Sequence, residues 1–172
     1  NIEETIITGF KGWQTNAAQE SAINRVRYTG KKFQRATQIK ATEKGIYLTF
    51  NTPLDAKSAN DLSNYSLERW NYLWADQYGS AHFATDTPKE TLDTYYKSPS
   101  KNVGKVGIPR NRSGELVYLT RAHLLDDQKT VFLKVHDMKA VDQMKISFAI
   151  KSSDGKNLTQ EIHNTVHKLT PD

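Results

Sequence analysis

The sequence contains no cysteine, and this absence removes several kinds of chemistry. Disulfide bonds, thiolate metal sites, cysteine nucleophiles and covalent haem attachment through C-x-x-C-H all require the missing thiol. The sequence also lacks a run of roughly 18 apolar residues, which a membrane-spanning helix would need. We therefore expect no cofactor in this chain and no membrane span.

Long amphipathic helices and catalytic signatures are missing as well. Without such helices a doubly wound α/β fold is not expected. No nucleophile elbow of the G-x-S-x-G type occurs, and no loop has the alternating oxygen ligands of an EF-hand. The acidic residues Asp126, Asp127 and Asp154 lie in expected turns. We therefore expect no catalytic residues and no enzyme activity.

The chain has 172 residues, a net charge of +5 and a composition typical of a globular protein. Lysine and arginine are scattered through the sequence rather than gathered in a stripe, so we expect no nucleic-acid partner. The first residues lack an initiator methionine and the basic and apolar parts of a signal peptide. We expect the chain to be a processed product or a fragment of a longer protein.

Short apolar segments alternate with turn residues at intervals of roughly ten residues, which predicts an antiparallel β-sandwich. Ile46, Leu48 and Phe50 illustrate the alternation that places every second side chain on one face. Asp55 is a candidate N-cap for one or two helical turns. We expect an all-β chain in which residues 1–35 form a short two-stranded segment and residues 36–172 form the sandwich. The strands are expected near residues 5–10, 22–29, 38–42 and 45–50, from residue 65 into the aromatic segment, at 116–120, at 124–135 on either side of a turn at 126–128, at 145–150, and at 158–169 as one strand or a pair.

An aromatic segment supplies the candidate site. Trp70, Tyr72 and Trp74 alternate, so an extended backbone would point all three to one face, and Tyr78 and His82 follow closely. Flat aromatic rings on such a face could stack on sugar rings. The alternative is packing in the core or at a domain interface, where tryptophan and tyrosine bury a large area. The five residues are therefore candidates for ligand binding or for an interface.

Two histidines have a spacing that could suit a metal ion. On a helix, His163 and His167 would share one face, whereas on a strand they would stand about 13 Å apart, too far for one ion. The β-branched residues around them favour a strand. We therefore expect no metal site.

Several motifs resemble those of bacterial Ig-like domains: LTFNTPLD at 48–55, NYSL at 64–67, DQKTVFL at 127–133 and KSSDGKNL at 151–158. Others are similar to the C-terminal region of large secreted bacterial proteins that carry a sugar (sorbosone/PQQ-type) dehydrogenase-like β-propeller, often fused to a c-type haem domain. These are GWQT at 12–15, RVRYTGK at 25–31, RWNY at 69–72, YGS at 78–80, QM at 143–144 and TVHKL at 165–169.

This resemblance covers nearly the whole chain and implies fold and setting more than activity. It implies that residues 1–35 are the last propeller strands and a linker, followed by a non-catalytic Ig-like accessory domain. The expected partner is the propeller or cytochrome domain of the parent protein, and the expected location is extracytoplasmic, either periplasmic or secreted. The alternative is a carbohydrate-binding module that uses the aromatic face, with polysaccharide as partner.

Overall fold

The structure, a computed structural model, describes residues 4–10, 21–27, 29–30, 33–72, 85 and 115–171. The chain divides into two compact units, residues 1–33 and residues 34–172. The first unit contains an antiparallel hairpin of β1 (Glu4–Phe10) and β2 (Ser21–Arg27). The expected identity of this segment as the last strands of a propeller stays a prediction.

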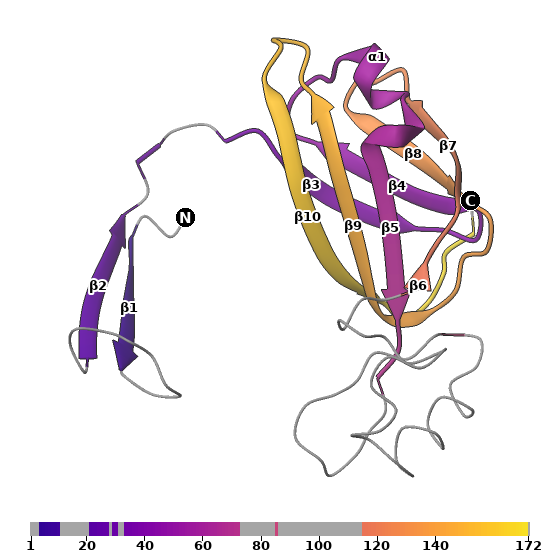
Figure 1. Cartoon of the computed structure of the whole chain (residues 1–172). Helices are drawn as coiled ribbons and strands as arrows, with labels where there is room; N and C mark the ends of the chain where they lie inside the picture. The colour runs from indigo at the N-terminus through magenta and orange to yellow at the C-terminus, as the bar shows by residue number, and fades with distance from the viewer. Residues whose placement is uncertain are drawn as a thin grey trace, which may run out of the picture. The chain divides into compact units, whose positions relative to one another are not determined.

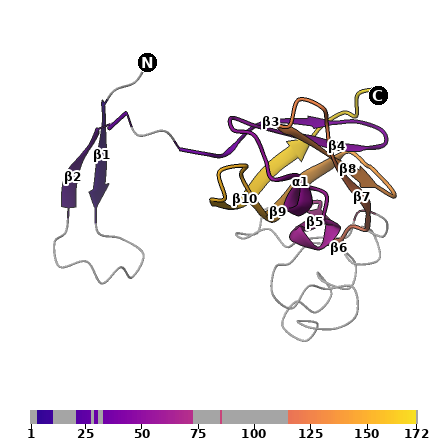
Figure 2. The same cartoon turned by 90° about the horizontal axis from the view of Figure 1, so that it is seen from above.

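The second unit is a sandwich of two antiparallel four-stranded sheets, which Figures 1 and 2 show as two layers. One sheet has the order β10-β9-β5-β6 and the other has the order β3-β4-β8-β7. Their strands are β3 (Ala36–Ala41), β4 (Gly45–Phe50), β5 (Tyr65–Trp70), β6 (Glu115–Leu116), β7 (Leu119–Leu124), β8 (Thr130–Val135), β9 (Val141–Lys151) and β10 (Asn157–Val166).

The strand order is that of the immunoglobulin fold. When β3 to β10 are lettered A, B, C, C′, D, E, F and G, the two sheets read ABED and GFCC′. The predicted all-β sandwich with a short two-stranded N-terminal segment is therefore confirmed.

The core lies between the two sheets and follows the predicted alternation. Ile46, Leu48 and Phe50 are at most 2% exposed, and every second residue of β8 and β9 is buried in the same way. The rings of Phe50 and Phe148 meet edge to face across the two layers, with centroids 5.2 Å apart. Each such side chain contributes about 1.5–3 kcal/mol when it is fully buried.

The connection from β4 to β5 crosses between the sheets through α1 (Ala56–Ala59) and the 3₁₀ turn η1 (Leu62–Asn64). Asp55 Oδ1 accepts a hydrogen bond from the Ser58 N–H at 2.8 Å, which confirms Asp55 as the N-cap. The Asn64 amide donates to the Ser58 carbonyl and the Tyr65 hydroxyl to the Ala59 carbonyl, each at 2.9 Å. These bonds compensate for a helix too short to be stable alone. Neither helix among the described residues is long and apolar enough to cross a membrane.

Two glycines are required for different structural reasons. Gly155 has a φ of +82°, which confirms the expected tight turn at residues 153–155. The sequence Glu43-Lys44-Gly45 predicts a turn in which Gly45 supplies a permissive conformation, but the φ of Gly45 is not positive. It is instead needed for space, because a Cβ there would lie 2.1 Å from the Leu133 carbonyl oxygen.

Candidate functional site

The aromatic candidates fall partly inside the described structure. Trp70 is the last residue of β5 and Tyr72 follows it, whereas Trp74, Tyr78 and His82 lie outside the described residues. The strand that was expected to carry the alternation ends at Trp70. A shared face for the alternating aromatic residues therefore stays a prediction.

Trp70 lies on the outer face of its sheet, although it is only 5% exposed. Along β5, Tyr65 and Leu67 point into the core between the sheets, and Trp70 is not part of that core. Its ring packs edge to face against His163, with centroids 6.1 Å apart. Trp70 therefore offers little ring surface for stacking on a sugar. Tyr72 is 37% exposed.

Two ion pairs surround Trp70 on the same outer face. Lys145 Nζ lies 2.5 Å from Glu68 Oε1, and His163 Nε2 lies 2.7 Å from Glu161 Oε1. The hydrogen bond to His163 lowers the pKa of Glu161 below its usual value. Both glutamates on this face therefore have a basic side chain within hydrogen-bonding distance. The described residues contain no group of three or more histidine and acidic side chains that could hold a metal ion.

The same face carries an open depression of about 400 Å³ at its η1 end. Glu161 is the only carboxylate among the described residues that line it. The lining can form hydrogen bonds through its hydroxyl, amide and carboxylate side chains. Its polar side chains come from Ser63, Asn64, Ser66, Ser147, Thr159, Gln160 and Glu161.

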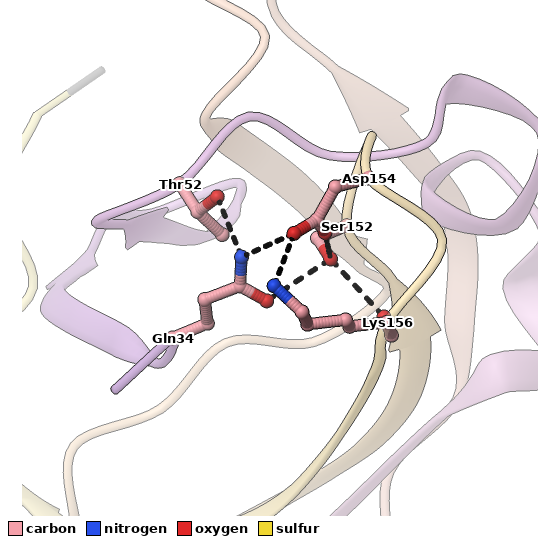
Figure 3. A network of polar contacts seen from close by, with 5 residues as sticks. All are labelled: Gln34, Thr52, Ser152, Asp154 and Lys156. Atoms are coloured by element: carbon pink, nitrogen blue, oxygen red, sulfur yellow. Dashed lines mark hydrogen bonds and ion pairs between the residues drawn. The ribbon is translucent and has the colours of Figure 1, made fainter. Parts of the chain in front are cut away.

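A second polar group lies where the chain enters the sandwich (Figure 3), and we call it the entry clasp. It consists of Gln34, Thr52, Ser152, Asp154 and Lys156. The Gln34 side-chain amide donates to Thr52 Oγ1 at 3.3 Å and to Asp154 Oδ2 at 3.2 Å. Its oxygen accepts from the Ser152 hydroxyl at 3.1 Å. Lys156 Nζ lies 2.6 Å from Asp154 Oδ2. The first residue of the second unit is thus bonded to both the turn after β4 and the β9–β10 hairpin.

Burial and charge hold the entry clasp together. Ser152 is fully buried, and its hydroxyl lies within reach of three acceptors: Gln34 Oε1, Asp154 Oδ1 and the Lys156 carbonyl. Hydrogen bonds from Lys156, from the Ser152 hydroxyl and from Gln34 hold the pKa of Asp154 well below its usual value. Asp154 therefore remains a charged acceptor at neutral pH.

The next two residues are also tied to the sandwich. The Arg35 N–H donates to Asn51 Oδ1 at 2.9 Å, and the Asn51 N–H donates to the Arg35 carbonyl at 3.1 Å. The Ala36 N–H donates to Gln160 Oε1 at 3.3 Å. Sequence reasoning missed this site because Gln34 and Ser152 are 118 residues apart and neither belongs to a local pattern.

No protein-family model and no curated protein matches the chain. Two solved structures similar to it are domains 1–6 of the surface layer protein SbsC and the N-terminal part of the bacterial S-layer protein SbsC. Each has a TM-score of 0.47 and 12% identity over 81% of this chain. The chain spans 14% of the first structure and 24% of the second. At this identity and TM-score, the likeness does not identify a family.

Proposed function

We propose that residues 34–172 are a non-catalytic Ig-like accessory domain of a larger extracytoplasmic protein, and that its task is to hold the incoming chain in a fixed position. The entry clasp is the observation that carries this proposal. A flexible linker needs no such bonds at the point where it meets a domain. Here the side chain of Gln34 and the backbones of Arg35 and Ala36 are all bonded to the sandwich.

The energetics support a positioning role. Fixing the backbone of one residue costs about 1–2 kcal/mol in conformational entropy. A net gain of about 0.5–1.5 kcal/mol per hydrogen bond offsets this cost over the three residues. The sandwich has its own core, so the hydrogen bonds at its entry serve mainly to orient the chain that precedes it.

The parent protein is part of the same proposal. The motif resemblance supports a dehydrogenase-like β-propeller or a c-type haem domain as the partner, with no cofactor bound by this chain. The hairpin β1–β2 fits such a setting, because an isolated two-stranded hairpin is only marginally stable in water. Within a larger sheet its edges would gain hydrogen-bonded neighbours.

Two measurements test the proposal: the coding sequence on either side of this chain, and an activity assay of the chain itself. We expect further propeller strands to be encoded in frame before residue 1. We also expect the 172-residue chain to show no turnover of sugars with an artificial electron acceptor. Turnover by this chain alone would contradict a non-catalytic role. A coding sequence without a propeller or haem domain would contradict the proposed parent.

A further inference from the structure

The outer face of the β3-β4-β8-β7 sheet carries a row of side chains that crosses all four strands. The register pairs Lys40 with Tyr47, Tyr47 with Phe132, and Phe132 with His123. Their chain neighbours in β4 and β8 point into the core, so these side chains share the opposite, solvent-facing side. Lys40 and His123 are exposed, and the two aromatic residues are half-buried.

The two aromatic rings form a low, continuous platform. The centroids of Tyr47 and Phe132 are 4.6 Å apart, and their planes differ by 35°. Phe132 extends over Gly45, where a Cβ would lie 2.9 Å from Phe132 Cε2 and 3.0 Å from Cζ. The phenylalanine ring therefore lies along the sheet surface instead of projecting from it. Lys40 Nζ lies over the Tyr47 ring, 5.8 Å from its centroid, in a cation–π contact that a ligand would meet or displace.

Positive charge flanks this platform. The adjacent row places Arg121 directly opposite Lys134, and both are exposed. Like charges opposite one another on a sheet are destabilising, so this pair costs stability unless an anion lies between or above them. Among the described outward positions of the two rows there is no carboxylate. Acidic side chains lie in the flanking turns: Glu43 between β3 and β4, and Asp126 and Asp127 before β8, of which Asp127 accepts hydrogen bonds from Thr130.

We propose that this aromatic and cationic face binds an acidic polysaccharide. The two adjoining ring surfaces suit the apolar face of a sugar ring. Lysine and arginine around it supply charge-assisted hydrogen bonds to carboxylate groups along the glycan. The row crosses three strand spacings, about 14 Å, which leaves room for a short run of sugars. We call this surface the cationic platform, with Lys40, Tyr47, Arg121, His123, Phe132 and Lys134 as its residues.

Charge and shape favour a glycan over a nucleic acid. Lys40, Arg121 and Lys134 are the permanent cations of the platform, whereas duplex-binding proteins commonly make about 6–10 phosphate contacts. The two rings are half-buried and pack against each other. They offer one broad surface rather than separate projecting rings that would hold successive bases. The proposal goes beyond the positioning role and does not rest on it, because the entry clasp and the platform share no residue.

The experiment measures binding of the full 172-residue chain to oligogalacturonate, with cellohexaose as the neutral probe and oligo-dT as the nucleic-acid probe. We expect oligogalacturonate to bind more tightly than the other two, with an affinity that falls as salt rises. The double variant R121Q/K134Q should weaken this binding by about tenfold, and Tyr47→Ala should also weaken it. Lys151→Gln, an exposed lysine on β9 of the other sheet, should leave it unchanged.

Three outcomes would overturn the proposal. They are no binding of oligogalacturonate, equal binding by wild type and R121Q/K134Q, and preferred binding of oligo-dT. Circular dichroism of each variant checks folding, and the exposed positions of Arg121 and Lys134 make their charge removal harmless to the core. A failure here would leave the entry clasp and the positioning role intact.

Discussion

Ser152→Ala is the substitution that probes the entry clasp most sharply. The Ser152 side chain is fully buried, and its hydroxyl lies 3.1 Å from Gln34 Oε1 and 3.2 Å from the Lys156 carbonyl. The variant loses hydrogen bonding from a buried hydroxyl, with a net value of about 0.5–1.5 kcal/mol. The acceptors belong to Gln34, Asp154 and Lys156, which are partly buried or exposed, so they can bond to water instead. We expect the free energy of unfolding to fall by about 1 kcal/mol.

Urea unfolding followed by circular dichroism measures this change, with the m-value as a check that the unfolded state is unaffected. Ser153→Ala is the matched control, because Ser153 is the next residue and is exposed. It should change stability by less than about 0.5 kcal/mol. If Ser152→Ala is as stable as Ser153→Ala, the hydroxyl does not hold the clasp, and the reasoning fails.

Three further predictions concern other parts of the sandwich. Tyr65→Phe should cost about 1–2 kcal/mol, since it leaves the buried Ala59 carbonyl without its donor, whereas Tyr118→Phe, at an 82% exposed side chain, should cost almost nothing. Burial raises the pKa of Tyr65, so the contribution of Tyr65 to the free energy of unfolding is fully present below about pH 10 and is lost as the pH rises above it. Above that pH, Tyr65→Phe should lose less stability than wild type, and equal losses would contradict this. The hydrogen bond from Lys156 is the largest cause of the lowered pKa of Asp154. Wild type should therefore be more stable than Asp154→Asn by its full margin above about pH 4, and by a smaller margin as the pH falls. A stability difference that is independent of pH in acid-unfolding curves would refute this. Gly45→Ala should cost more than about 2 kcal/mol because of the close Leu133 carbonyl, and a melting temperature equal to that of wild type would show that the strand relaxes and would contradict this reasoning.

The strands and their inward faces could be predicted because alternation is a local property of the sequence. Ile46, Leu48 and Phe50 show their shared face within six residues of chain, and Asp55 shows its capping role within four. The order of the strands in the two sheets is not local, and periodicity does not determine it. The requirement for glycine at position 45 could not be predicted correctly, because a close approach between two strands produces no local sequence pattern.

The functional residues were harder to predict for the same reason. The aromatic alternation drew attention to Trp70, but the structure ends β5 there and packs the ring against His163. The entry clasp and the cationic platform are each assembled from distant segments. Gln34 meets Ser152 across 118 residues, and Lys40 joins Phe132 and His123 only through the sheet register. No spacing rule applied to one stretch of sequence would group these residues.

Hydrogen exchange at the Arg35 and Ala36 amides of the 172-residue chain tests the central claim most directly. Both N–H groups donate to side chains of the sandwich, Asn51 and Gln160. We predict that they exchange as slowly as paired amides inside β3, and that Gln34→Ala speeds their exchange while Gln38→Ala, an exposed glutamine in β3, does not. Exchange at the rate of an open linker in the wild-type chain would contradict the claim that the sandwich fixes the chain that enters it.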